Sequence, residues 1–90
     1  MKKSGAAVQA EVVTASHSGV VVPRASVVFD ETGPHVFVVA GGKAERVFVT
    51  LGLNHGDDVE IGGKLAAGSQ VAVEGAYELQ DGMPVKVRGK

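Results

Sequence analysis

The stretch that decides the fold is "HVFVVAGGKAERVFVTLG", residues 35–52. Two runs rich in valine and phenylalanine flank the pair Gly41-Gly42. A two-residue hairpin turn needs positive φ angles, which glycine adopts without steric cost. The pattern therefore predicts an antiparallel hairpin in which residues 36–40 pair with residues 44–48. Apolar residues alternate onto both faces of this hairpin, so we expect it to lie in the middle of a sheet or roll.

The composition of the whole chain points to the same fold class. The 90 residues include 18 valines but only four leucines and one isoleucine, together with 13 glycines and three prolines. Valine is stiff at χ1 and suits a pleated sheet, whereas glycine and proline divide the chain into short pieces. We predict one all-β domain at residues 7–90, a small roll or barrel of about six short antiparallel strands with at most one helical turn. Residues 1–6 are expected to be disordered or left over from cloning.

Charge and residue usage exclude several classes of function. The nine basic and ten acidic residues are spread along the chain without a basic stripe, and the chain has only three phenylalanines and one tyrosine, so we expect no nucleic-acid partner. The absence of cysteine rules out disulfides and thiol chemistry. No apolar run is long enough to span a membrane, and "MKKSG" at the start is not followed by the apolar stretch of a signal peptide.

Side chains that carry chemistry are sparse. His17, His35 and His55 show no ligand spacing, although "NHGDD" places His55 near Asp57 and Asp58 as weak candidates for a metal site. The "NHGDD" segment lacks the ligand number of a calcium loop and the ligand set of a zinc site. No serine lies in a G-x-S-x-G elbow, and "GGKAERV" lacks the spacing of a phosphate-binding loop. The sequence therefore predicts no enzyme, no cofactor and no specific metal site.

Three segments, read in order, carry a resemblance to a known family. They are "VVVPRASVV" (residues 20–28), the hairpin stretch, and "DDVEIGGKLAAGSQVAVEGAYELQDGMPVKV" (residues 57–87). Together they resemble the membrane-proximal domain of the periplasmic adaptor subunits, or membrane fusion proteins of the HlyD-like family, of RND-type tripartite efflux pumps. The resemblance covers roughly residues 7–88. Lys64, inserted in the glycine-leucine turn, and Ser69, in place of an acidic residue, depart from the family pattern.

The resemblance implies a fold and a set of partners. It implies a β-roll, with residues 7–13 matching the closing strand of a neighbouring β-barrel domain or the crossover from it. The segment "GAYELQDGMP" would be a corner with Tyr77 and Leu79 as a lid, letting residues 85–87 pair back beside the strand at residues 20–23. The implied partners are an inner-membrane RND transporter, an outer-membrane channel reached through the full-length adaptor, and other adaptor copies.

The implied location is the periplasm of a Gram-negative bacterium, at the inner membrane. Two other functions stay open. One is a metal-binding or metal-relay module of a heavy-metal efflux adaptor, which only the histidines favour. The other is a β-fold enzyme, for which no constellation of residues speaks.

Overall fold

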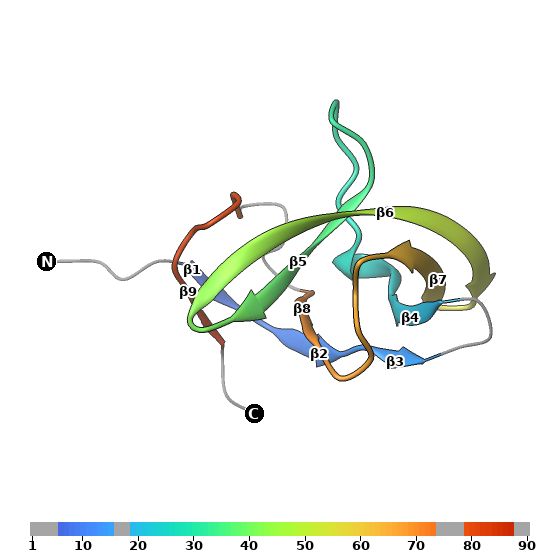
Figure 1. Ribbon diagram of the computed structural model, residues 1–90, viewed down its shortest axis with the longest axis horizontal. Helices are drawn as coiled ribbons and strands as arrows, with labels where there is room; N and C mark the ends of the chain where they lie inside the picture. The colour runs from blue at the N-terminus through green and yellow to red at the C-terminus, as the bar shows by residue number, and fades with distance from the viewer. Residues whose placement is uncertain (1–5, 16–18, 74–78, 88–90) are drawn as a thin grey trace, which may run out of the picture.

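The computed structural model describes residues 6–15, 19–73 and 79–87. In chain order the elements are β1 (Ala6–Val8), β2 (Ala10–Val12), β3 (Thr14–Ala15), β4 (Val20–Pro23), the 3-10 helix η1 (Arg24–Ser26), β5 (His35–Ala40), β6 (Lys43–His55), β7 (Asp58–Gly63), β8 (Gln70–Ala72) and β9 (Val85–Val87). Seven strands form one sheet in the order β2-β8-β5-β6-β7-β4-β3, and β1 and β9 form a two-stranded sheet (Figure 1). No helix in the described part of the chain is long and apolar enough to cross a membrane.

The all-β class expected from composition is confirmed, with two corrections. The main sheet has seven strands rather than about six, and β6 is 13 residues long. The β1–β9 pair is parallel, not antiparallel. A parallel pair needs a long connection, and here almost the whole domain lies between the two strands. The composition of residues 76–82 suggests about one helical turn that ends at Gly82, but the described part, residues 79–82, is not helical. Residues 76–78 lie outside the described residues.

The β5–β6 hairpin pairs antiparallel across Gly41-Gly42 as predicted, and its pairs lie one residue nearer the turn on β6 than the range 44–48 implies. His35 pairs with Phe48 and Ala40 pairs with Lys43. Gly41 and Gly42 form the turn with φ angles of 60° and 76°. Both strands have neighbours on their outer sides, β8 beside β5 and β7 beside β6, so the hairpin does lie in the middle of the sheet.

A second hairpin is found at residues 53–58, where the composition of "LNHGDD" predicts a loop instead. β6 continues to His55, and β7 begins at Asp58, which is the register partner of His55. The connection between them is only the two-residue turn Gly56-Asp57, with Gly56 at a φ of 67°. The asparagine, glycine and aspartates that suggest a loop are the residues that favour such a tight turn.

Two apolar clusters lie on opposite faces of β5. Neighbouring residues of a strand point to opposite faces, so Val36 belongs to one cluster and Phe37 to the other. The first cluster, inside the roll, contains Val13, Val20, Val22, Val27, Val36, Val49, Val59, Ile61 and Val71. The second contains Val8, Val28, Phe37, Ala44, Ala72, Leu79 and Val85. The first half of β5 is thus covered on both sides, whereas most of β6 is exposed.

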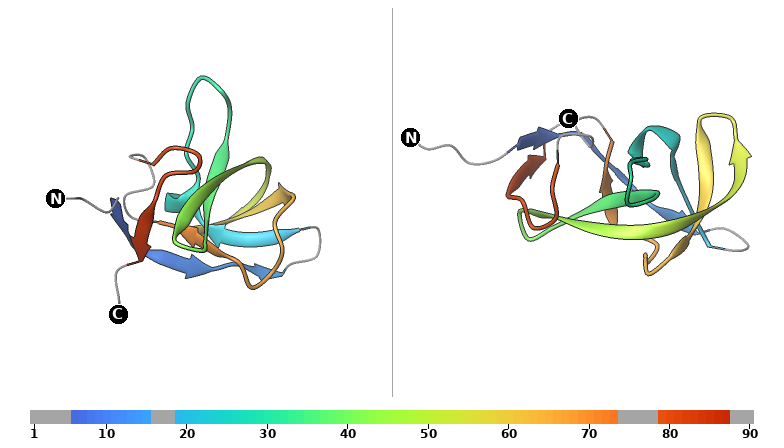
Figure 2. Two further views of the ribbon diagram at one scale, coloured as in Figure 1. Left: turned by 60° about the vertical axis from the view of Figure 1, so that its left-hand side comes forward. Right: turned by 90° about the horizontal axis from the view of Figure 1, so that it is seen from above.

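The N-terminal strands close the sheet into a nearly complete barrel. β2 pairs with β8 at one edge of the sheet, and β3 pairs with β4 at the other edge. Between them, the N–H of Val13 donates to Ser69 O at 2.8 Å, and Val13 O accepts from the N–H of Gly68 at 2.9 Å. The left view of Figure 2 shows these blue strands running past β8 and β4. Residues 7–13 therefore pair within this domain, and a place for them in a neighbouring domain stays a prediction.

The last strand does not pair where the sequence suggests. Residues 85–87 lie beside residues 6–8 and not beside residues 20–23. The reason is that both edges of β4 are already taken, by β7 and by β3. Leu79, expected to act as a lid, is buried in the second cluster, while Tyr77 lies outside the described residues.

Candidate functional site

The residues proposed as weak metal ligands lie at the tip of the β6–β7 hairpin. The Nε2 atom of His55 lies 3.0 Å from Oε2 of Glu60, which pairs it with a carboxylate that the sequence does not single out. Asp57 lies in the turn and Asp58 follows it, and their carboxylates make no ion pair with His55. Within the described ranges, no group of three or more histidine and acidic side chains could hold a metal ion. The structure thus brings together two polar side chains here, which is fewer than a zinc site needs.

The hairpin tip is fixed to the 3-10 helix η1. The Nη2 group of Arg24 donates to Gly56 O at 3.0 Å, and the backbone N–H of Arg24 donates to Asp57 O at 2.8 Å. Ser26, fully buried, donates its hydroxyl to Pro23 O at 2.7 Å and so holds the turn of η1. These bonds give the tip a defined position beside the end of the barrel.

An apolar groove lies between the hairpin and the chain that follows η1. We call it the Phe29 groove; it has a volume of about 230 Å³ and is lined by Arg24, Val27, Phe29, Leu51, Asn54 and Val59. Phe29 is 54% exposed and Leu51 is 47% exposed, and Leu53, further along β6, is 67% exposed. The pairing of β6 with β7 shifts register between Leu51 and Asn54, which interrupts the alternation of faces at this point. Grouped exposed apolar side chains of this kind are typical of a binding surface.

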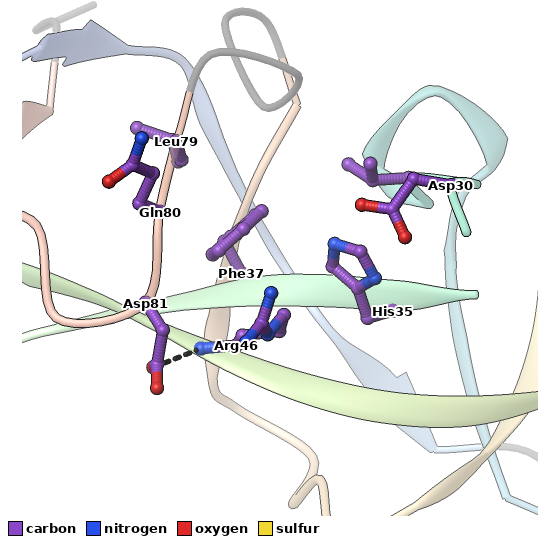
Figure 3. A pocket seen from close by; sticks show the side chains of 8 residues that line it. Asp30, His35, Phe37, Arg46, Leu79, Gln80 and Asp81 are labelled. Atoms are coloured by element: carbon purple, nitrogen blue, oxygen red, sulfur yellow. Dashed lines mark hydrogen bonds between the residues drawn. The ribbon is translucent and has the colours of Figure 1, made fainter. Parts of the chain in front are cut away.

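A larger cavity lies on the other face of β5. We call it the His35 cavity; its volume is about 420 Å³, and it is lined by Val28, Asp30, His35, Phe37, Arg46, Leu79, Gln80 and Asp81 (Figure 3). His35, which is 1% exposed, donates from Nδ1 to Gly33 O at 2.9 Å and meets the rings of Phe37 and Phe48 edge-on, with centroids 5.3 and 5.5 Å away. The lining includes no serine, cysteine or lysine that could act as a nucleophile. His17 lies outside the described residues.

One carboxylate at the rim of the His35 cavity is held in its ionised form. The hydroxyl and the backbone N–H of Thr32 donate to Oδ1 of Asp30 at 2.6 and 2.9 Å. These hydrogen bonds, the hydroxyl's first, lower the pKa of Asp30, and the positive charge of Arg46 adds to the effect. Asp30 is fully exposed, so its charge is well solvated.

The comparison of the chain with known protein families found a match to a family model. Residues 19–87 match the model described as YknX, C-terminal permuted SH3-like domain. The chain belongs to this family. The family is a membrane-fusion-type adaptor domain, so the resemblance seen in the sequence is confirmed. The comparison with curated proteins gave no match.

Membership of this family indicates the general function of the domain. It supports a membrane fusion role in efflux, in which the adaptor acts with transporter and channel partners. The match begins at residue 19, after β1, β2 and β3, although the segment that contains these strands supplies Val8 and Val13 to the two apolar clusters. In this chain the barrel is therefore completed by residues that precede the matched range.

Proposed function

We propose that this chain is a non-catalytic adaptor domain of a tripartite efflux pump, located in the periplasm at the inner membrane. It docks on an RND transporter and, within the full-length adaptor, helps to couple that transporter to an outer-membrane channel. Membership of the adaptor family supports this proposal. The single structural observation that carries it is the Phe29 groove, where exposed apolar side chains gather at one end of the barrel.

The groove suits docking that depends on several weak contacts. Phe29, Leu51 and Leu53 together expose an apolar surface that is small compared with a stable interface, which buries about 1,200–2,000 Å² in total. A single copy would therefore bind weakly. Several copies that contact the transporter at once gain affinity because each later contact is intramolecular. Contacts with other adaptor copies are thus part of the proposed mechanism.

Photocrosslinking in cells tests the docking surface. A photoreactive amino acid at position 53 of the full-length adaptor should crosslink to the transporter. The matched control is position 12, because Val12 is also apolar and 54% exposed but lies on β2, three strands away from β6 in the sheet and outside the lining of the groove. Equal crosslinking from both positions, or none from position 53 while efflux continues, would reject this surface as the docking site.

The metal-relay function has one observation in its favour. Nε2 of His55 lies 3.0 Å from Oε2 of Glu60. The side chain of His55 is 50% exposed and that of Glu60 is 13% exposed. Two ligands would hold zinc only weakly, because stable sites use three or four. A metal-relay role would therefore need ligands from a partner, and we rank it second.

A further inference from the structure

The His35 cavity has the size and the lining of a small-molecule site. Its volume of about 420 Å³ falls within the ordinary range of ligand pockets, about 300–1,000 Å³. Phe37, Leu79 and Val28 give it an apolar floor, and each of them is at most 7% exposed. Polar side chains enter from four separate segments: Asp30 from the turn before β5, His35 from β5, Arg46 from β6, and Gln80 and Asp81 from residues 79–82. The cavity is separate from the Phe29 groove and shares no lining residue with it.

Arg46 brings a positive charge into this cavity. Its side chain, half-buried, extends from β6 between Asp81 and His35 in the close-up (Figure 3). The guanidinium carbon lies 5.4 Å from the centroid of the Phe48 ring, and Arg46 makes no ion pair with any carboxylate among the described residues. A guanidinium presents a rigid fork of donors that matches a carboxylate, and such a bond is strongest where water is partly excluded.

Neither carboxylate at the rim forms an ion pair with Arg46, although the charge of Arg46 helps to lower the pKa of Asp30. Oδ1 of Asp30 accepts both hydrogen bonds from Thr32, and Oδ1 of Asp81 accepts the backbone N–H of Arg46 at 3.0 Å. Both aspartates are exposed, so water screens their charges. The half-buried guanidinium is less screened and therefore provides the stronger electrostatic attraction for a ligand.

A buried imidazole adds a second polar contact. Since Nδ1 of His35 donates to the carbonyl of Gly33, the neutral ring has its lone pair on Nε2. Nε2 has no hydrogen-bond partner among the residues that the structure describes, although His35 is 1% exposed. Buried polar atoms are normally satisfied, so this acceptor suits a donor supplied by a bound molecule.

We propose that the His35 cavity binds a small amphipathic carboxylate that also carries an N–H group, of the N-acyl amino acid type. The carboxylate binds the Arg46 guanidinium, the N–H donates to Nε2 of His35, and the apolar body lies on Phe37 and Leu79. This site is independent of transporter docking, so either proposal can fail without the other.

Chemical-shift titration of the whole 90-residue chain tests the site. The probe is N-acetylphenylalanine, with its primary amide and phenethylamine as matched compounds. We expect saturable shifts of the amide signals of His35, Phe37 and Arg46 with a Kd of about 1 mM, and binding of the primary amide weaker by about tenfold. The proposal would be overturned by equal binding of the acid and the amide or by tighter binding of the amine. It would also be overturned if the acid caused no shift at a concentration several times the expected Kd.

A pair of variants isolates the role of Arg46. Arg46→Met keeps the length of the side chain and the backbone bond to Asp81 but removes the charge, and should weaken binding of the acid by about tenfold. Lys64→Met, an exposed cation outside the cavity, should leave the affinity unchanged. Undiminished binding by Arg46→Met would overturn the assignment. If that variant does not fold, the comparison of acid with amide on the unaltered chain decides alone.

Discussion

The backbone N–H of Val13 donates to the carbonyl of Ser69 at 2.8 Å, and this bond lies where the N-terminal segment crosses from one edge of the sheet to the other. On either side of it, β2 pairs with β8 and β3 pairs with β4. The side chain of Val13 is 1% exposed and belongs to the cluster inside the roll. The segment therefore both covers two sheet edges and fills the core, which protects edges that would otherwise invite association.

Truncation of Val13 should destabilise the domain, whereas truncation of its neighbour should not. Val13→Ala removes two buried methyl groups and should lower the free energy of unfolding by roughly 2 kcal/mol. Val12→Ala, at a position 54% exposed on the same segment, should change it by less than about 0.5 kcal/mol. Urea unfolding of both variants measures the difference. Equal effects would mean that the segment does not close the barrel in solution.

The turn of the central hairpin gives a second prediction. Gly42 has a φ of 76°, and a Cβ built there meets no atom within 4 Å, so the cost of a side chain is conformational and not steric. Gly42→Val should lower the free energy of unfolding by roughly 1–3 kcal/mol. Gly42→Asn should cost less, because asparagine tolerates positive φ better. Thermal unfolding compares the two variants, and identical midpoints would contradict the turn.

The sequence is sufficient to predict the hairpin because its signals are local. The glycine pair and the flanking alternation determine both the turn and the register within 14 residues. Closure of the barrel depends instead on pairs such as Glu11 with Val71, which are 60 positions apart, and the weak alternation at residues 7–13 does not identify the partner strand. The long β6 was missed because residues typical of a loop form its tight turn to β7.

The candidate sites also depend on contacts between residues far apart in the sequence, which local patterns do not predict. Glu60 becomes the partner of His55 only when the turn at Gly56 is known to place β7 beside β6. Arg46 and Leu79 meet in the His35 cavity from positions 33 apart, with no shared motif to suggest it. By contrast, family membership could be predicted, because it depends on the order of several motifs and not on any single contact.

The ionisation of Asp30 gives a prediction about pH. Its pKa is lowered in the folded state, mainly by the hydrogen bond from the Thr32 hydroxyl. A lowered folded-state pKa contributes stability above the unfolded-state pKa, and that stability is lost as the pH falls through the folded value. Thr32→Val should raise the pKa of Asp30, measured by the carboxyl carbon shift between pH 2 and 6 (about the range in which aspartate titrates). An unchanged titration would show that the Thr32 hydroxyl does not donate in solution, and Thr14→Val, at an exposed threonine on β3, serves as the control.

Metal binding is predicted to be weak. Because His55 forms an ion pair with Glu60 and no group of three possible ligands lies within the described part of the chain, zinc should give no saturable isotherm with a dissociation constant below about 1 µM. Isothermal titration calorimetry measures this directly. A tight isotherm that disappears in His55→Ala but persists in His35→Ala would promote the metal-relay function above the docking function.

The last prediction concerns the Phe29 groove in the isolated domain. Because Leu53 is 67% exposed, Leu53→Asp should change the free energy of unfolding by less than about 0.5 kcal/mol. Val49→Asp, at a position 6% exposed in the inner cluster, should prevent folding.

An interface well below about 1,000 Å² is usually weak, so the unaltered domain should sediment as a monomer at about 100 µM. A dimer that Leu53→Asp dissociates would show that the groove binds a second copy, and self-association would then compete with the transporter for the same surface. If the domain docks through this groove, cells that carry Leu53→Asp should show reduced efflux although the variant domain is folded and monomeric.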